Sequence, residues 1–312
     1  DLQSYGKSGD GILMINNGDN NFNQSNQKVF LDLGMITDAK FHDLNDDGWS
    51  DLIIVGEWMP ITILMNDKGV FHNQTKKFGM DNTSGLWNTI ELIDINQDGK
   101  MDFIAGNHGT NSFFENSMKM YINDFDENGS YEQIICLERE GKYFPILDKD
   151  ELINQLPILK KNIVYYKDYA NKSLNQIIDK TKLLESKVLQ IDLLETSLFL
   201  NKETKFKQYS LPDEIQYSPI YSILNKKDTK TNKNSLYLGG NQYLVKPQFG
   251  SYDASKGWHI SLSQNENNFF KSTPQSIGIK GQIRAIKALK NNQKEYLIFG
   301  INDKKIKFYE LH

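Results

Sequence analysis

The sequence predicts an all-β protein, a β-propeller of four-stranded antiparallel blades interrupted by one helical insertion. Three observations support this fold class. Apolar strands that end in glycine recur along the chain, hairpins that end in phenylalanine recur between them, and segments of alternating polarity precede the glycine strands. Four antiparallel strands in each repeat of roughly 40 to 60 residues are typical of propeller blades.

The repeated segments define the order of strands within a blade. The glycine strands span 52–56, 103–106, 236–240 and 296–300, and the hairpins end at Phe22, Phe71, Phe206 and Phe269. The alternating segments are MITDAKFHDL, NTIELIDI, MKMYINDF, YSPIYSILN and QIRAIKALK. Because alternation with a period of two indicates a half-buried strand, we count five blade starts.

Three of the blade starts run into loops that are rich in acidic residues. In each loop, side chains with oxygen atoms stand at positions 1, 3, 5 and 9, and a glycine stands at position 6. These side chains are Asp43, Asn45, Asp47 and Asp51 in the first loop, Asp94, Asn96, Asp98 and Asp102 in the second, and Asp124, Asp126, Asn128 and Glu132 in the third. Position 7 adds the backbone carbonyl of Trp49, Lys100 or Ser130.

This spacing of oxygens predicts three calcium sites. Calcium takes about six to eight oxygen ligands, and glycine permits the sharp turn that gathers them. Magnesium is less suited, because it demands a small octahedral site and retains its water. An EF-hand would need glutamate at position 12, where this chain has Ile54, Ala105 and Ile135. We expect the metal to stabilise the fold, with calcium-regulated binding as the alternative.

The fourth and fifth repeats lack such loops. Asn225 and Asp228 in the fourth repeat are poor ligands because they have no acidic partners, and the fifth repeat has lost its aspartates. We therefore predict no metal at either repeat.

Composition limits the class of protein. The chain of 312 residues is 38% hydrophobic and 12% aromatic, which is ordinary for a folded globular protein. Its formal charge of −4 gives no basic surface for nucleic acid, and three divalent ions would move that charge to about +2 by addition. The single cysteine, Cys136, lies in an apolar run and is expected to be a buried thiol.

The chain shows no targeting or membrane segment of its own. Its first residues do not resemble a signal peptide, and no apolar run reaches the length that spans a bilayer. Because Asp1 begins in the middle of a strand pattern, we expect an export signal upstream of this sequence.

One stretch breaks the strand pattern and predicts helices. Residues 147–188 have helical spacing of apolar residues, and Ser173 with Gln176 forms a capping box. The apolar residues on one face of the expected helix are Leu174, Ile177, Ile178 and Leu184. We expect one propeller domain with blades in 1–146, a helical insertion in 147–188 and further blades in 189–312. The helices would cover an edge of the propeller or, alternatively, form a docking surface.

The residues also resemble a known family. The acidic loops and glycine strands are similar to FG-GAP or VCBS repeats, the propellers of integrin-alpha type with calcium loops. The longer motifs VGEWMPITILMNDKGVF, NTSGLWN, AGNHGTNS, DELINQLPILKK and KPQFGSYDASKG resemble the C-terminal propeller of bacterial surface proteins similar to cartilage acidic protein. The resemblance covers nearly the whole chain.

This resemblance implies a seven-bladed propeller at the cell surface or in the secreted fraction. It also implies that the protein binds or scaffolds protein or glycan partners without catalysis. The chain departs from the family in its five blade starts, which indicate that further blades lie upstream or that the ring is smaller.

Two sets of residues are candidates for contact with a ligand or substrate. Trp58 and Trp87, next to Glu57 and Asn88, stand near strand ends and suit sugars or peptides, although tryptophans at such places also pack between blades. A carbohydrate-active enzyme is the alternative function, with Glu57 and Asp253 as its acids. The five histidines, which show no metalloprotease spacing, are His42, His72, His108, His259 and His312. We therefore expect no enzyme.

Overall fold

Antiparallel β-sheets make up most of the regular structure of this chain. The computed structural model describes residues 5–227, 234–262, 273–291 and 294–311. Within these ranges five larger sheets, a separate two-stranded hairpin and a few short helices are present. The all-β prediction is therefore confirmed. None of the helices described is both long enough and apolar enough to cross a membrane.

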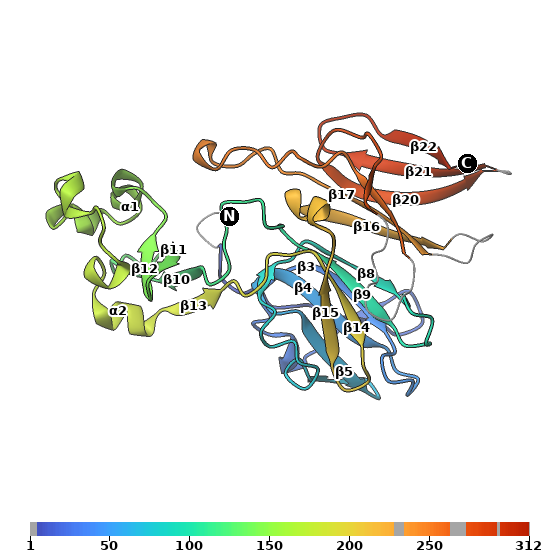
Figure 1. Cartoon of the computed structure of the whole chain (residues 1–312). Coiled ribbons are helices and arrows are strands. Elements are labelled where there is room, and N and C mark those ends of the chain that lie inside the picture. Colours follow the sequence, from blue (N-terminus) through green and yellow to red (C-terminus); the bar gives the residue numbers. More distant parts are fainter. Residues whose placement is uncertain (1–4, 228–233, 263–272, 292–293, 312) are drawn as a thin grey trace.

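Four of the larger sheets follow one another in space (Figure 1). The first contains β3 (Met35–His42), β4 (Asp51–Met59), β5 (Thr62–Asp67) and β6 (Val70–Asn73), with β7 (Gly85–Leu86) also paired to β4. The second contains β8 (Thr89–Ile93), β9 (Asp102–Gly106), β14 (Ser197–Asn201) and β15 (Phe206–Ser210). The third contains β16 (Ile220–Lys227), β17 (Asn234–Gly240), β18 (Trp258–Ser261) and β19 (Gln275–Ser276), and the fourth β20 (Ile283–Asn291), β21 (Lys294–Ile301) and β22 (Lys307–Leu311).

The first strands of these four sheets, β3, β8, β16 and β20, lie side by side in that order. Strands β3 and β16 each contain a register shift near their start, and the residue directly after the unpaired one bonds to the next sheet. Asp38 accepts the backbone N–H of Ile90 at 3.0 Å, and Ser222 accepts that of Ile286 at 2.9 Å. Polar links of the same kind thus join the first sheet to the second and the third sheet to the fourth.

The predicted glycine strands are the second strands of these sheets, β4, β9, β17 and β21. They form the apolar layers between neighbouring sheets, as shown by Ile53 against Phe103 and by Ile104 against Leu238. Glycine is required near the end of β4, because a Cβ at Gly56 would lie 2.3 Å from the carbonyl oxygen of Met35.

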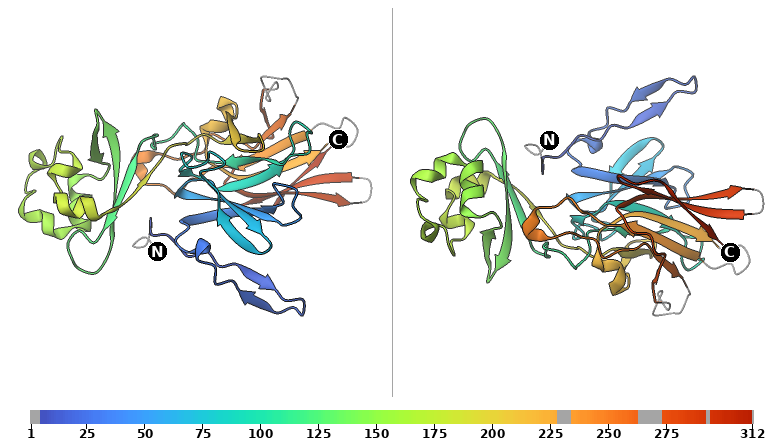
Figure 2. Two further views of the ribbon diagram at one scale, coloured as in Figure 1. Left: turned by 90° about the horizontal axis from the view of Figure 1, so that it is seen from below. Right: turned by 90° about the horizontal axis from the view of Figure 1, so that it is seen from above.

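The fifth sheet interrupts the second. After β9 the chain forms β10 (Lys119–Asn123), β11 (Glu132–Arg139), β12 (Lys142–Pro145) and β13 (Lys187–Gln190), paired in the order β12-β11-β10-β13. It then returns to pair β14 with β9, with Leu198 opposite Ile104. We call residues 117–191 the excursion. In Figure 2 it projects to one side of the other sheets.

The excursion corrects the interpretation of the third repeat. Its strands do not continue the row of four sheets, and the hairpin that ends at Phe206 completes the second sheet rather than the third repeat. The interruption of the row is therefore longer than 147–188 and includes the third acidic loop.

Helices cover one face of the excursion sheet. They are α1 (Lys149–Gln155), α2 (Lys180–Glu185), η3 (Pro157–Lys161), η4 (Tyr166–Asp168) and η5 (Leu174–Gln176). Leu174 and Ile178 pack with Ile134 and Cys136 of β11, so the predicted apolar face covers this sheet. The capping box between Ser173 and Gln176 is present, but Leu184 is 77% exposed and lies outside that apolar contact.

Three further short helices and one hairpin complete the described chain. They are η2 (Lys28–Phe30), η6 (Asp213–Tyr217), η7 (Pro247–Phe249) and the hairpin of β1 (Met14–Asn16) with β2 (Phe22–Gln24). Phe71 and Phe206 are buried at their hairpins, whereas Phe22 is 55% exposed because its hairpin joins no larger sheet. Asp1, Asp228, Phe269 and His312 lie outside the described residues.

Excising the excursion is expected to leave the four-sheet row folded. The N–H of Ser117 donates to the carbonyl of Ile191 at 2.7 Å, so a short Gly/Ser linker can replace residues 118–190. The product should retain its β-rich circular dichroism and one elution peak, although the uncovered side chains of Trp58 and Leu86 will lower its solubility.

Removal of residues 147–188 alone provides the comparison. That deletion strips the helices from Ile134 and Cys136 and should give an aggregating protein. If the longer excision unfolds the chain and the shorter one does not, the excursion is not a separable unit.

Candidate metal-binding loops

The three acidic loops share one backbone conformation. Each joins the first and second strands of its sheet, and we call them loop 1 (43–51), loop 2 (94–102) and loop 3 (124–132). Position 4 has a positive φ in all three, 59° at Asp46, 57° at Gln97 and 60° at Glu127. The glycines at position 6 have φ values of 86°, 84° and 86°, a region that favours glycine.

The first aspartate of each loop closes the turn. The carboxylate of Asp43 accepts the backbone N–H groups of Asp47 at 3.1 Å and Gly48 at 2.7 Å. Asp94 accepts the equivalent pair at 3.2 and 3.0 Å, and Asp124 does so at 3.0 and 2.9 Å. The loops therefore hold this carboxylate in the same place three times.

The carboxylate at position 9 ties each loop to the sheet. Asp51, Asp102 and Glu132 are buried, and they accept the N–H of the residue at position 2 at 2.8, 3.1 and 3.0 Å, respectively. Asp51 and Asp102 each accept one more N–H at 2.7 Å, from Asn66 and Asn201 of the strands that follow.

Burial raises the pKa values of the three carboxyl groups at position 9. Desolvation is the main cause that raises the pKa of Asp102 to about 7, and the charges of Asp98 and Asp94 act in the same direction. The pKa values of Asp51 and Glu132 are raised for the same two reasons. A bound cation would offset both causes, because it neutralises the charge that burial and neighbouring carboxylates oppose.

Loop 3 brings three carboxylates together. One oxygen each from Asp124, Asp126 and Glu132 lies within 4.8 Å of the others, and the described residues contain no second group of this kind. The Oδ1 atom of Asp126 is buried and has no hydrogen-bond partner. A carboxylate oxygen that is buried without a partner is costly unless a cation or water satisfies it.

In loops 1 and 2 an asparagine takes the place of the second acid. The amide of Asn45 donates to Asp47 at 2.9 Å, and that of Asn96 donates to Asp98 at 2.7 Å, so positions 3 and 5 converge. All the atoms that could ligate a metal in the three loops are hard oxygens, which fits calcium. Trp49, Lys100 and Ser130 offer their backbone carbonyls at position 7, and the ammonium of Lys100 pairs with Glu203.

The four predicted ligand-contact residues lie largely inside the protein. Trp87 has no exposed surface and packs edge-on against Phe199, with ring centroids 5.9 Å apart. Trp58 is 2% exposed and donates its indole N–H to the hydroxyl of Tyr5 at 2.9 Å. The same hydroxyl donates to Glu57 at 2.7 Å, and the side-chain nitrogen of Asn88 is buried without a partner. The tryptophans therefore serve packing and offer no open face to a ligand.

Tyr5, Phe249 and Tyr252 line a wide cleft, and no sequence pattern marks them as ligand contacts. Phe249 and Tyr252 belong to the motif KPQFGSYDASKG, whose family resemblance does not point to a ligand. No local spacing relates Tyr5 to that motif, because the two meet only through the fold.

A family model for the FG-GAP-like repeat matches residues 43–105. This match spans loops 1 and 2 with strands β4 to β8, and with the all-β architecture it supports an FG-GAP repeat fold. No curated protein sequence matches the chain significantly.

Proposed function

We propose that this chain is a calcium-stabilised binding module of the β-propeller type, without catalytic activity, at the cell surface or secreted. It would recognise protein or glycan partners and is related to bacterial surface proteins similar to cartilage acidic protein. The observation that supports the metal is the threefold repetition of one hydrogen-bonded acidic loop with converging oxygens. Extracellular calcium modules bind with a Kd of about 10⁻⁴ to 10⁻³ M, which suits exposed loops of this kind.

The propeller arrangement is supported by the row of sheets. Each first strand lies beside the next, and apolar side chains fill the space between sheets, as expected for successive blades.

The absence of catalysis is part of the proposal. The carboxylate of Glu57 accepts the hydroxyl of Tyr5, and Asp253 is an exposed side chain, so neither is an obvious acid or base in a shared site. Hydrolysis of any polysaccharide by the wild-type protein that disappears in Glu57→Gln or Asp253→Asn would favour the carbohydrate-active enzyme instead.

Calcium is expected to raise the melting temperature. A ligand that binds only the folded state stabilises it by RT ln(1 + [L]/Kd), which is about 1.4 kcal/mol for each site at a tenfold excess over Kd. A domain of this size should then melt about 5 °C higher in millimolar calcium than in chelator, whereas magnesium should have a smaller effect. Scanning calorimetry measures this shift, and identical curves in calcium and chelator would contradict the metal assignment.

Loop variants locate the sites. Asp98→Ala removes a ligand from loop 2 and should lower the calcium stoichiometry by one in calorimetric titration. Asp81→Ala is the matched control, because Asp81 is exposed and outside the three loops. Equal loss of calcium in both variants would mean that the loops are not the sites.

A further inference from the structure

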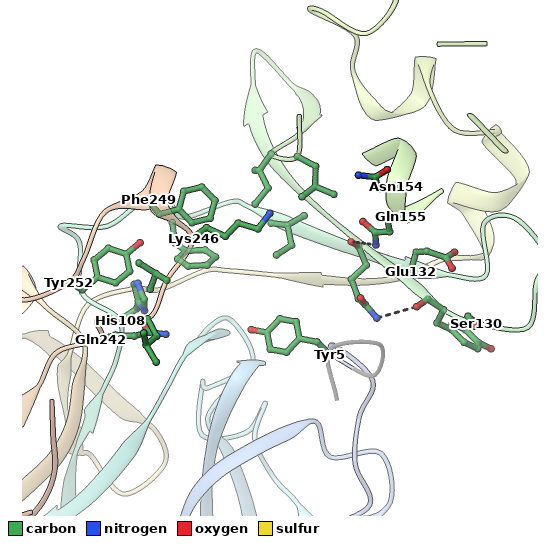
Figure 3. Close-up of a pocket in the computed structure, with 18 of the residues that line it drawn as sticks. Tyr5, His108, Ser130, Glu132, Asn154, Gln155, Gln242, Lys246, Phe249 and Tyr252 are labelled. Atoms are coloured by element: carbon green, nitrogen blue, oxygen red, sulfur yellow. Dashed lines mark hydrogen bonds between the residues drawn. The ribbon is translucent and has the colours of Figure 1, made fainter. Parts of the chain in front are cut away.

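A wide cleft lies between the excursion and the row of sheets. It has a volume of about 810 Å³, within the range of roughly 300–1,000 Å³ for small-ligand sites. One wall is α1 with the start of β11, and the other is the segment between β17 and β18 (Figure 3). Tyr5 lies at the bottom of the view in Figure 3.

The wall from the β17–β18 segment is rigid and aromatic. Phe249 stacks on Phe113 with ring centroids 4.1 Å apart, and Tyr252 packs edge-on against His108 at 4.7 Å. The backbones of Gln242 and Tyr252 exchange hydrogen bonds at 2.8 and 2.9 Å, which fixes the base of this segment. The aromatic faces are therefore held in place before a ligand arrives.

The opposite wall supplies amides. Asn154 and Gln155 of α1 face the aromatic wall in Figure 3. Gln155 donates to the carbonyl of Gln133 at 3.0 Å, whereas the side chain of Asn154 makes no hydrogen bond within the described residues. A side-chain amide both donates and accepts hydrogen bonds, which matches a hydroxyl group that does the same.

The cleft offers little net charge. Lys246 and Glu132 are the charged residues that line it, and Lys246 pairs across the cleft with Glu151 of α1 at 2.9 Å. Burial lowers the pKa of His108 to about 4, so its ring is neutral near pH 7, and its Nε2 atom has no hydrogen-bond partner. Neither an anionic nor a cationic ligand would find a complementary charge here.

We propose that this cleft binds a neutral carbohydrate, which deepens and rests on the binding function proposed above. Phe249 and Tyr5 provide flat apolar faces for sugar rings, and the amides of Asn154 and Gln242 bond to hydroxyl groups. Asn128, Ser130 and Glu132 of loop 3 also line the cleft, so calcium in this loop orders one wall of the site.

The test uses the full chain in millimolar calcium. Neutral oligosaccharides with glucan, xylan and mannan backbones are screened on an array beside sulfated and sialylated glycans and a random peptide library. Isothermal titration then measures the affinity of the best neutral probe. Binding of a neutral probe is the expected result, and binding of peptides or charged glycans alone, or of no probe at millimolar concentration, would overturn the proposal.

Matched variants locate the binding. Asn154→Ala and Phe249→Ala should each lower the affinity for the neutral probe about tenfold or more, a change typical of a lost contact. The controls are Asn82→Ala and Phe308→Ala, which alter an exposed asparagine and a phenylalanine that is 64% exposed. Equal affinity in all four variants would place the sugar elsewhere and overturn the assignment to this cleft.

Variants of the calcium loops distinguish a failure of this inference from a failure of the proposed function. Asp126→Ala in loop 3 should lower the affinity for the neutral probe, whereas Asp98→Ala in loop 2 should leave that affinity unchanged. If calcium raises the melting temperature but no neutral probe binds, the inference fails and the calcium-stabilised module stands. If a neutral probe binds the cleft but calcium changes nothing, the calcium assignment fails instead.

Discussion

Replacing Phe199 with alanine is expected to lower the free energy of unfolding by about 3–5 kcal/mol, the range for large aromatic side chains in protein cores. Phe199 is 1% exposed, stacks on Phe103 with ring centroids 4.9 Å apart and meets Trp87 edge-on. Its removal opens a cavity between the first two sheets, where Ile53 also packs. Urea unfolding followed by circular dichroism measures the change.

This variant also tests the discontinuous sheet. Phe199 of β14 lies opposite Phe103 of β9, although the whole excursion separates them in sequence. Phe308→Ala removes the same side chain from an exposed place and should change stability by no more than about 0.5 kcal/mol. If Phe199→Ala were equally mild, β14 would not belong in the second sheet.

Replacing Asp102 with alanine is expected to destabilise the protein by about 2–6 kcal/mol even in chelator. The carboxylate accepts the N–H groups of Ile95 and Asn201, and each buried donor left without a partner costs about 1–3 kcal/mol. This part of the loss should therefore be present without calcium, and the loss of a metal ligand adds to it when calcium is bound. Chemical unfolding in the presence of chelator isolates this contribution.

Two comparisons make the Asp102 result specific. Asp102→Asn retains one acceptor oxygen but turns an NH₂ group toward the other donor, so its loss should be intermediate. Asp98→Ala alters an exposed residue of the same loop and should have a small effect in chelator. If Asp98→Ala and Asp102→Ala were equally destabilising in chelator, the buried hydrogen bonds would not be the cause.

The acidic loops were predictable because their chemistry is local. The ligand spacing and the glycine at position 6 lie within nine residues of sequence, and the turn that joins them depends on their own backbone hydrogen bonds. What the sequence did not reveal is the second partner of Asp102. Asn201 is distant in the chain and reaches the loop only because β14 pairs with β9.

The tryptophans illustrate the opposite case. Trp58 and Trp87 stand beside polar residues at strand ends, a pattern that suits either ligand contact or packing. Burial decides between the two, and it depends on Tyr5, Phe114 and Phe199, which come from other parts of the chain. The cleft also depends on the tertiary structure, because its walls come from the excursion and from the β17–β18 segment, which are far apart in the sequence.

The sequence by itself determined the all-β class, the five strand sets, the glycine strands and the conformation of the acidic loops. Each depends on residues within one or two strands, where side-chain period, turn chemistry and close backbone approach act locally. Only the tertiary structure decided that the third strand set leaves the row and that β14 completes the second sheet. Backbone ladders have the same hydrogen-bonding groups at every residue, so the choice of partner strand rests on apolar packing between segments that are far apart in sequence.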